Sequence, residues 1–201
     1  MNSRHDRRRF VSGLMLCAVG AGGLAGRDSA RAAMLPEPMQ PLQVPGVELV
    51  MNIVATCSDP VPTGGPEVKG PSRDGIRDEI WPITGGRFWG RGMRGKVVPG
   101  GGDFPVQRPD GVDYVDALYR LLTDDGVTIV IHNKGLAYPP SAPGKDDIYR
   151  LQPEFYAPAG RYAWLNKGLF VATLIYPVPH GLEMARGPHE NDRLIQVFKI
   201  T

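Results

Sequence analysis

Cysteine is scarce in this chain of 201 residues, which has only Cys17 and Cys57. Long apolar runs are missing too, since nothing after residue 32 reaches the roughly 18 consecutive apolar residues of a membrane span. Residues 33–201 contain no Lys/Arg-rich run, which argues against a nucleic-acid-binding surface. No segment keeps a 3.6-residue apolar period with caps at its ends, so long helices are not expected.

Motifs for metal binding are also missing. No H-x-H, H-E-x-x-H or paired Cys/His spacing occurs, and the four His are scattered. We therefore predict no metal and no other cofactor. Cys57 ends an apolar stretch, and we interpret it as a small buried hydrophobe because no His or Asn partner stands out for a nucleophile.

Glycine and proline are abundant instead. All 20 Pro and 21 of the 26 Gly lie after residue 32. Such frequent breaks leave little room for helices and favour many short strands joined by turns. The hydrophobic content of 42% is enough for one core, so wholesale disorder is not expected.

Residues 1–32 have the three parts of an export signal. A basic segment ending in 7–10 (RRRF) precedes an uncharged stretch over 11–26, and the small-x-small sequence 30–32 (ARA) follows. The paired arginines and the nearby aromatic residue are similar to a twin-arginine signal. We predict cleavage after Ala32, with the export machinery as a partner and a periplasmic or secreted product that keeps no stable membrane anchor. An N-terminal anchor is the alternative, which the shortness of the apolar stretch disfavours.

The same segment accounts for the basic charge of the chain. The full sequence has 23 Lys and Arg against 21 Asp and Glu, a net charge of +2. Residues 1–32 hold six of those Arg and two of those Asp, so the remainder has 17 basic and 19 acidic residues. The exported part is thus slightly acidic, and no electrostatic attraction to nucleic acid or anionic membranes is expected.

Residues 33–46 contain four prolines and are predicted to be an extended leader, so one domain covers 47–201. A Pro- and Gly-rich loop is predicted over 58–75. Short apolar stretches separated by turns such as 90–92 and 124–126 favour an antiparallel barrel or sandwich. The expected strands are residues 47–55, 80–89, 93–99, 111–123, 127–134, 148–156, 162–165, 169–176 and 194–200.

A series of short motifs resembles the DUF3237 family, also called UPF0311. These motifs are residues 83–90 (ITGGRFWG), 94–103 (RGKVVPGGGD), 108–111 (RPDG), 116–117 (DA), 123–126 (TDDG) and 161–166 (RYAWLN). The resemblance covers roughly residues 46–200. It implies an all-β fold, a single small antiparallel barrel of about eight or nine strands with a central cavity, and a tendency to form homo-oligomers. It implies no particular reaction.

Four side chains are candidates for proton transfer. Asp116 is the first choice because Asp is disfavoured in mid-strand, and a carboxyl facing a barrel cavity would have a raised pKa. Its structural alternative is an exposed strand residue bonded to Arg or Tyr. Asp103 follows three glycines and could be a carboxylate at the barrel rim, or simply an Asx-turn residue. Tyr119 and His132 are alternates, and His132 could face a cavity from its strand.

Four further residues are candidates for positioning a ligand. Arg77 and Arg87 could each bind a carboxylate through two hydrogen bonds, although arginines at the surface are common. Trp164 could form an apolar wall and Asn166 could orient a carbonyl group. Their structural alternatives are a core tryptophan and a turn asparagine.

Together these features predict a periplasmic barrel that binds a small aromatic or carbonyl-bearing molecule. The expected chemistry is an isomerisation, cyclisation or hydration without a redox cofactor. One rival is a non-catalytic carrier or sensor, which would have a mainly apolar cavity. The other rival is a protein-interaction module, which would have a filled interior and an exposed apolar patch.

Overall fold

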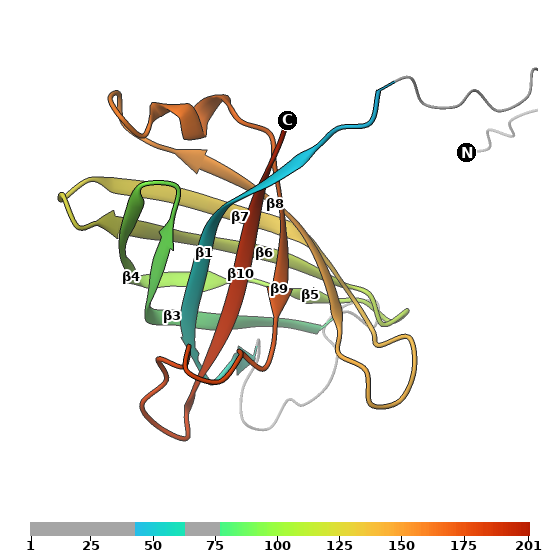
Figure 1. The fold of residues 1–201 in the computed structure, drawn as a ribbon. Helices are drawn as coiled ribbons and strands as arrows, with labels where there is room; N and C mark the ends of the chain where they lie inside the picture. The colour runs from blue at the N-terminus through green and yellow to red at the C-terminus, as the bar shows by residue number, and fades with distance from the viewer. Residues whose placement is uncertain (1–42, 63–76) are drawn as a thin grey trace, which may run out of the picture. The chain divides into compact units, whose positions relative to one another are not determined.

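A closed ring of eight antiparallel strands forms the domain (Figure 1). The computed structural model describes residues 43–62 and 77–201, and the statements below concern these residues. β1 closes the ring because it pairs with both β10 and β3. The strands of the ring are β1 (Val47–Ser58), β3 (Arg77–Gly90), β4 (Met93–Asp103), β6 (Asp113–Thr123), β7 (Thr128–Tyr138), β8 (Ile148–Tyr156), β9 (Phe170–Ile175) and β10 (Glu190–Ile200).

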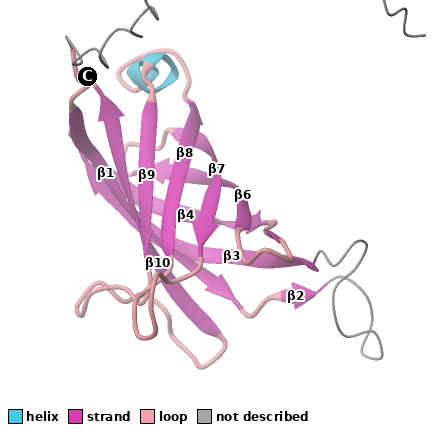
Figure 2. Cartoon of the chain, turned by 90° about the vertical axis from the view of Figure 1, so that its right-hand side faces the viewer, coloured by secondary structure: helices cyan, strands magenta, loops and turns pink. Residues whose placement is uncertain are grey.

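Two short strands supplement the ring: β2 (Val61–Pro62) pairs with β3, and β5 (Val106–Gln107) pairs with β3 and β6. Figure 2 shows strands through most of the domain and one short helix, the 3₁₀ helix η2 (Ala163–Lys167). The all-β fold and the antiparallel barrel are therefore confirmed. No helix within the described ranges is long and apolar enough to cross a membrane.

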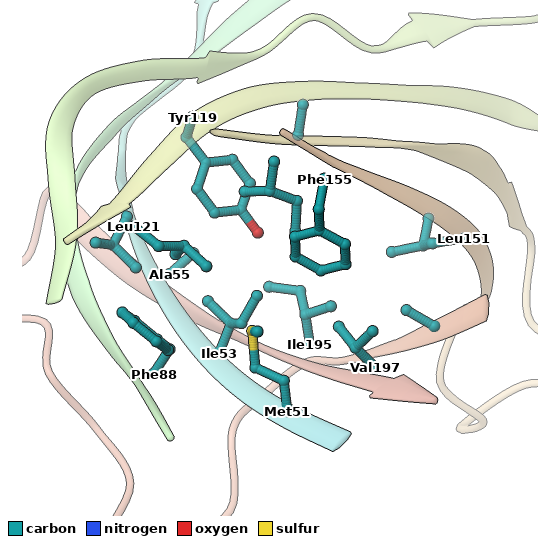
Figure 3. Close-up of a cluster of buried hydrophobic side chains, with 14 of the residues drawn as sticks. Met51, Ile53, Ala55, Phe88, Tyr119, Leu121, Leu151, Phe155, Ile195 and Val197 are labelled. Carbon is teal, nitrogen blue, oxygen red and sulfur yellow. The ribbon is translucent and has the colours of Figure 1, made fainter. Parts of the chain in front are cut away.

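Strict alternation along the strands builds the barrel wall. In β6, Val115, Ala117, Tyr119 and Leu121 are buried, while the residues between them, Asp116 among them, are exposed. Closing a sheet into a barrel sends alternate side chains inward, where they form the core. Figure 3 shows this core, with side chains from several strands around the ring converging on one apolar cluster.

The segment after β8 fills one end of the barrel. Leu165 of η2 is 1% exposed and belongs to the core cluster. The Tyr162 hydroxyl donates a hydrogen bond of 2.8 Å to Asp125 at the β6–β7 turn, and Arg161 donates one of 3.0 Å to the carbonyl of Gly92 at the β3–β4 turn. These bonds tie the segment to the tips of two hairpins.

The expected strand over residues 162–165 is wrong, because Tyr162 caps η2 and residues 163–165 begin it. The Tyr162 hydroxyl bonds Asp125 of the β6–β7 turn, and Leu165 turns into the core from the helix. The expected strand 148–156 coincides with β8, and both glycine turns form, with φ of 71° at Gly92 and 84° at Gly126. Of the expected loop 58–75, residues 63–75 lie outside the described part of the chain, as do residues 1–42.

The glycine run of β4 allows an unusually close contact with β6. A Cβ added at Gly101 would lie 2.5 Å from the Cβ of Tyr119 and 2.8 Å from the carbonyl oxygen of Leu118. The register between β4 and β6 shifts between Val98 and Gly102, as expected for a bulge. Gly101 therefore leaves the space through which the Tyr119 side chain enters the barrel.

We expect Gly101→Ala to destabilise the barrel by roughly 1–3 kcal/mol, because the added methyl group overlaps backbone and side-chain atoms of β6. Gly85→Ala is the matched control, since an added Cβ there meets no heavy atom within 4 Å. The control should stay within about 1 kcal/mol of the wild type. Urea unfolding of the three proteins measures the difference, and equal midpoints for both variants would contradict the prediction.

Candidate functional site

A cavity of about 130 Å³ lies at the end of the barrel opposite η2. Its lining residues come from strands between β3 and β10, which lie far apart in the sequence. Closure of the ring brings these residues together. It has three acids, one cation, one amide, two aromatic side chains and four apolar residues. The lining residues are Glu79, Trp81, Asp103, Pro105, Gln107, Asp113, Val115, Ala137, Tyr149, Leu174 and Arg193.

Asp103 is placed in this cavity by its register with β3 and β6. It pairs with Trp81 on one side and with Ala117 on the other, and Ala117 pairs in turn with Asn133. Directly paired residues of neighbouring strands project to the same side of a sheet. Asp103 and Asn133 therefore both point inward on the two sides of Ala117, whose small methyl group leaves space between them.

The Asp103 carboxylate also holds the wall together. Its Oδ1 accepts a hydrogen bond of 3.0 Å from the backbone N–H of Asp116, and the N–H of Phe104 donates one of 3.0 Å to the carbonyl of Asp116. Pro105 follows and has no N–H to donate. The backbone pairing of β4 with β6 ends here, and β5 pairs with β6 further along. At this junction the Asp103 carboxylate is the acceptor for the N–H of Asp116.

Burial raises the pKa of Asp103 from its ordinary value of 3.8 to about 6. The hydrogen bond from the Asp116 backbone and the charge of Arg193 oppose this rise, and the charge of Asp116 adds to it. A carboxyl group with a pKa of about 6 exchanges protons readily near neutral pH. Asp103 is therefore suited to serve as a general base or a general acid.

Arg193 is the one cation among the described residues that line the cavity. Its guanidinium carbon lies 4.5 Å from the centre of the Trp81 ring, a cation–π distance. The Trp81 indole N–H donates a hydrogen bond of 2.8 Å to Glu79, which also accepts one of 3.0 Å from Gln107. A chain of contacts from Gln107 to Arg193 thus fixes the Trp81 ring and the cation over it.

Three polar side chains lie on the inner face close to this cavity. The Tyr119 hydroxyl is buried without a hydrogen-bond partner, and so is Oδ1 of Asn133. Figure 3 shows Tyr119 projecting into the barrel interior, with its hydroxyl oxygen among hydrocarbon side chains. Burial raises the pKa of Cys57, while Arg193 opposes the rise. Buried polar atoms normally have partners, so the Tyr119 hydroxyl and Oδ1 of Asn133 leave hydrogen-bonding capacity unused inside the barrel.

Burial raises the pKa values of two further cavity groups. It is the main cause for Asp113, where the charges of Asp147 and Glu79 also raise the pKa. It is likewise the main cause for the phenol of Tyr149. Burial at this end of the barrel therefore disfavours the charged forms of Asp103, Asp113 and Tyr149.

Asp116 does not face the cavity, contrary to expectation. Its side chain is 52% exposed on the outer wall, where it pairs with His132, which is 22% exposed. The opposite face of β6 carries the buried Val115, Ala117, Tyr119 and Leu121, and its polar residues Asp113 and Thr123 stand only at the two ends of the strand. That face is the more apolar of the two, so it turns inward and takes Asp116 and, through the β6–β7 pairing, His132 to the outside.

Trp164 and Asn166 lie at the η2 end, away from the cavity. Trp164 packs 6.0 Å from Phe170 between ring centres, and Asn166 hydrogen-bonds both the N–H and the carbonyl of Ala157 at 2.8 Å. Arg87 lies on the outer wall of β3, where it pairs with Lys96 of β4. The backbone of Arg77 pairs with Gln107 at the start of β3, and its side chain lies outside the described part of the structure.

Of the predicted site residues, the structure brings Asp103 and Tyr119 together in the interior. Sequence reasoning missed Arg193, Trp81 and Asn133. An inward Arg193 was hard to find because both alternating sets of residues in 190–200 contain apolar side chains. Within residues 43–62 and 77–201, no three His, Cys, Asp or Glu side chains form a group that could hold a metal ion.

The protein is thus a closed antiparallel barrel with a cavity of acids, aromatic rings and one arginine at one end. Its sequence belongs to the family described as "Protein of unknown function (DUF3237)", whose model matches residues 45–183. The family predicted from the motifs is confirmed.

Relatives with the UPF0311 designation are similar over much of the chain. One from Rhodopseudomonas palustris strain TIE-1 is 33% identical over 110 residues, which cover 49% of this chain and 71% of the relative. Another, from Clostridium acetobutylicum, is 31% identical over 135 residues, which cover 62% and 82%.

Solved structures share the barrel. A protein of unknown function from Clostridium acetobutylicum matches with a TM-score of 0.62 and 28% identity, covering 80% of this chain and all of that one. A structure described as an enzyme from Penicillium herquei matches with a TM-score of 0.56 and 19% identity, covering 82% and 99%. At that identity the second likeness concerns the fold alone.

We expect Asp103→Asn to flatten the pH dependence of stability. Because the pKa of Asp103 is about 6 in the folded chain and ordinarily 3.8, the folded state binds this proton more tightly. That stabilising contribution is complete below about pH 4 and is lost as the pH rises through about 6. Asn keeps an oxygen to accept the Asp116 N–H and does not titrate.

The variant should therefore gain on the wild type between pH 4 and pH 7, by up to roughly 3 kcal/mol. Urea unfolding at four pH values in that range measures the gain. Parallel curves for the two proteins would show that Asp103 titrates normally in the folded state.

Proposed function

We propose that the cavity binds a small aromatic or carbonyl-bearing molecule and that Asp103 transfers a proton to or from it. The observation that carries this proposal is a partly buried carboxyl with a pKa of about 6 in a cavity that also holds Arg193. A carrier would need neither group, because an apolar lining is enough to hold an apolar ligand.

In the proposed reaction the Asp103 carboxylate removes a proton from a carbon next to a ligand carbonyl. The electrons of the C–H bond move onto the carbonyl oxygen, and the Arg193 guanidinium stabilises the enolate that forms. The protonated Asp103 then returns the proton to another atom of the ligand, which gives an isomer. The same carboxylate could instead activate a ligand hydroxyl or a water molecule for addition, giving a cyclisation or a hydration.

The size and lining of the cavity support a ligand of about one ring. A cavity of roughly 150 Å³ accommodates benzene in another protein, and this one measures about 130 Å³. Trp81 and Tyr149 offer aromatic surfaces, while Val115 and Leu174 complete an apolar wall. A planar ligand with a polar oxygen suits this combination of surfaces.

The two rival functions make different demands on the interior. A carrier or sensor calls for a mainly apolar cavity, whereas Glu79, Asp103, Asp113 and Arg193 all line this one. An interaction module calls for a filled interior, whereas this barrel has a cavity of about 130 Å³ at one end. Both observations favour catalysis.

We expect the protein to exchange the methyl protons of 4-hydroxyacetophenone for deuterium in D₂O. This probe has one ring and an enolisable ketone, and proton NMR follows the loss of its methyl signal. Asp103→Asn should slow the exchange by about 100-fold or more, since a positioned general base typically contributes that much. The wild-type rate should rise with pH through about 6 as Asp103 loses its proton.

Lys134→Gln on the outer wall of β7 is the control and should exchange at the wild-type rate. Saturation-transfer NMR on the same samples reports binding separately from exchange. A probe that binds without exchanging would favour the carrier. Exchange that is unchanged in Asp103→Asn would remove Asp103 from the mechanism.

We also propose that the protein acts in the periplasm or outside the cell, after twin-arginine export. The support is the sequence of residues 1–32, with its basic start, uncharged middle and small-x-small end. Replacing both Arg7 and Arg8 by Lys should block export in a bacterium that has the twin-arginine translocase.

Mass spectrometry of the periplasmic fraction should find the wild-type chain starting at Ala33, and Arg27→Lys, outside the pair, should be exported normally. Equal export of the double variant would point to a different route.

A further inference from the structure

The outer wall of the barrel carries a cationic patch around one tryptophan. Arg87 and Trp89 of β3 pair directly with Lys96 and Arg94 of β4. Phe88, between the first two, faces the core and is 1% exposed, so its neighbours face outward. The four outward side chains therefore form one patch, separated from the cavity by the barrel wall.

A groove of about 490 Å³ lies over this patch. Arg87, Trp89 and Arg94 line it, and Asp124 and Leu182 complete its wall. Leu182 comes from the segment between β9 and β10, which lies far from β3 and β4 in the sequence. The volume is within the range of small-molecule sites, about 300–1,000 Å³.

The charges of the groove do not balance. Arg94 is 3.1 Å from Asp124, the acid that lines the groove. Neither Arg87 nor Lys96 forms an ion pair within the described ranges of the chain. Two positive charges are thus left beside an open groove, and an anion there would be attracted from solution.

Arg87 also has a donor that points to a missing acceptor. Its Nε is buried and forms no hydrogen bond with any described residue. Its guanidinium carbon lies 5.4 Å from the centre of the Trp89 ring, a cation–π contact that orients the group. A buried N–H without an acceptor is unfavourable, and a carboxylate can accept from Nε and a terminal nitrogen of the same guanidinium.

We propose that this groove is a second ligand site, separate from the barrel cavity, that binds a small aromatic carboxylate. The carboxylate accepts two hydrogen bonds from Arg87. Its negative charge also balances part of the positive charge of Arg87 and Lys96. The ring of the ligand lies between Trp89 and Leu182. The site depends on neither Asp103 nor proton transfer, so it stands independently of the proposed function.

Calorimetric titration with 2-naphthoate tests the site, with the neutral 2-naphthalenemethanol as the matched probe. We expect 2-naphthoate to bind the wild-type protein at least tenfold more tightly than the alcohol. Arg87→Gln should weaken 2-naphthoate by about tenfold or more, because the charge and both hydrogen bonds are lost. Arg87→Lys should recover only part of the affinity, because an ammonium group lacks the planar fork.

Lys134→Gln is the control for a lost surface charge and should bind 2-naphthoate like the wild type. Thermal unfolding establishes that each variant is folded. If Arg87→Gln binds 2-naphthoate as well as the wild type, the proposal is wrong. If instead Asp103→Asn loses affinity and Arg87→Gln does not, the carboxylate binds in the barrel cavity, which also overturns it.

A hexaglutamate peptide distinguishes a macromolecular partner from a small ligand. The groove proposal expects the peptide to bind more weakly than 2-naphthoate, because it has no ring to place against Trp89. Tighter, Arg87-dependent binding of the peptide would assign the groove to acidic protein segments and would overturn the small-ligand site.

Discussion

Hydrogen bonds that join β1 to both β10 and β3 close the sheet, and this closure decides on which side of the wall each residue lies. Asp103 and Asp116 illustrate how sharply it does so. The carboxylate of Asp103 accepts the backbone N–H of Asp116, yet one side chain lines the cavity and the other is 52% exposed outside. Two acids in direct contact therefore meet different dielectric surroundings, and burial raises the pKa of the inner one to about 6.

The two ends of the barrel interior differ in polarity. Toward η2 the side chains are hydrocarbon and nearly free of solvent, as with Phe88, Leu165 and Phe170. Toward the cavity, the buried atoms of Tyr119 and Asn133 have no partners, and each such atom costs about 1–3 kcal/mol. Burial at the apolar end offsets that cost, so the fold tolerates unpaired polar groups at the other end.

Much of the fold could be predicted from the sequence, because glycine turns and apolar strands are local signals. β8 and the turns at Gly92 and Gly126 are where the pattern indicates. The site could be predicted only in part. Asp116 was favoured because a mid-strand acid is unusual, but the middle of the other face of β6, with Val115, Ala117 and Leu121, is the more apolar and takes the inside. Arg193 is inward because it shares an alternating set with Ile195 and Val197, which are buried in the core, and the other set of β10 also contains apolar residues, so the local pattern does not decide between them.

The pairing of β1 with β10 has a consequence for the order of events during synthesis. β1 leaves the ribosome early, but one of its two neighbours consists of residues 190–200, which emerge more than a hundred residues later. One edge of β1 stays unpaired until translation reaches that strand, so the ring closes only on a nearly finished chain. Such late closure slows folding. It favours an export pathway that receives the polypeptide only after the whole chain has been made. An export route that accepts only folded cargo, such as the predicted twin-arginine route, meets that requirement.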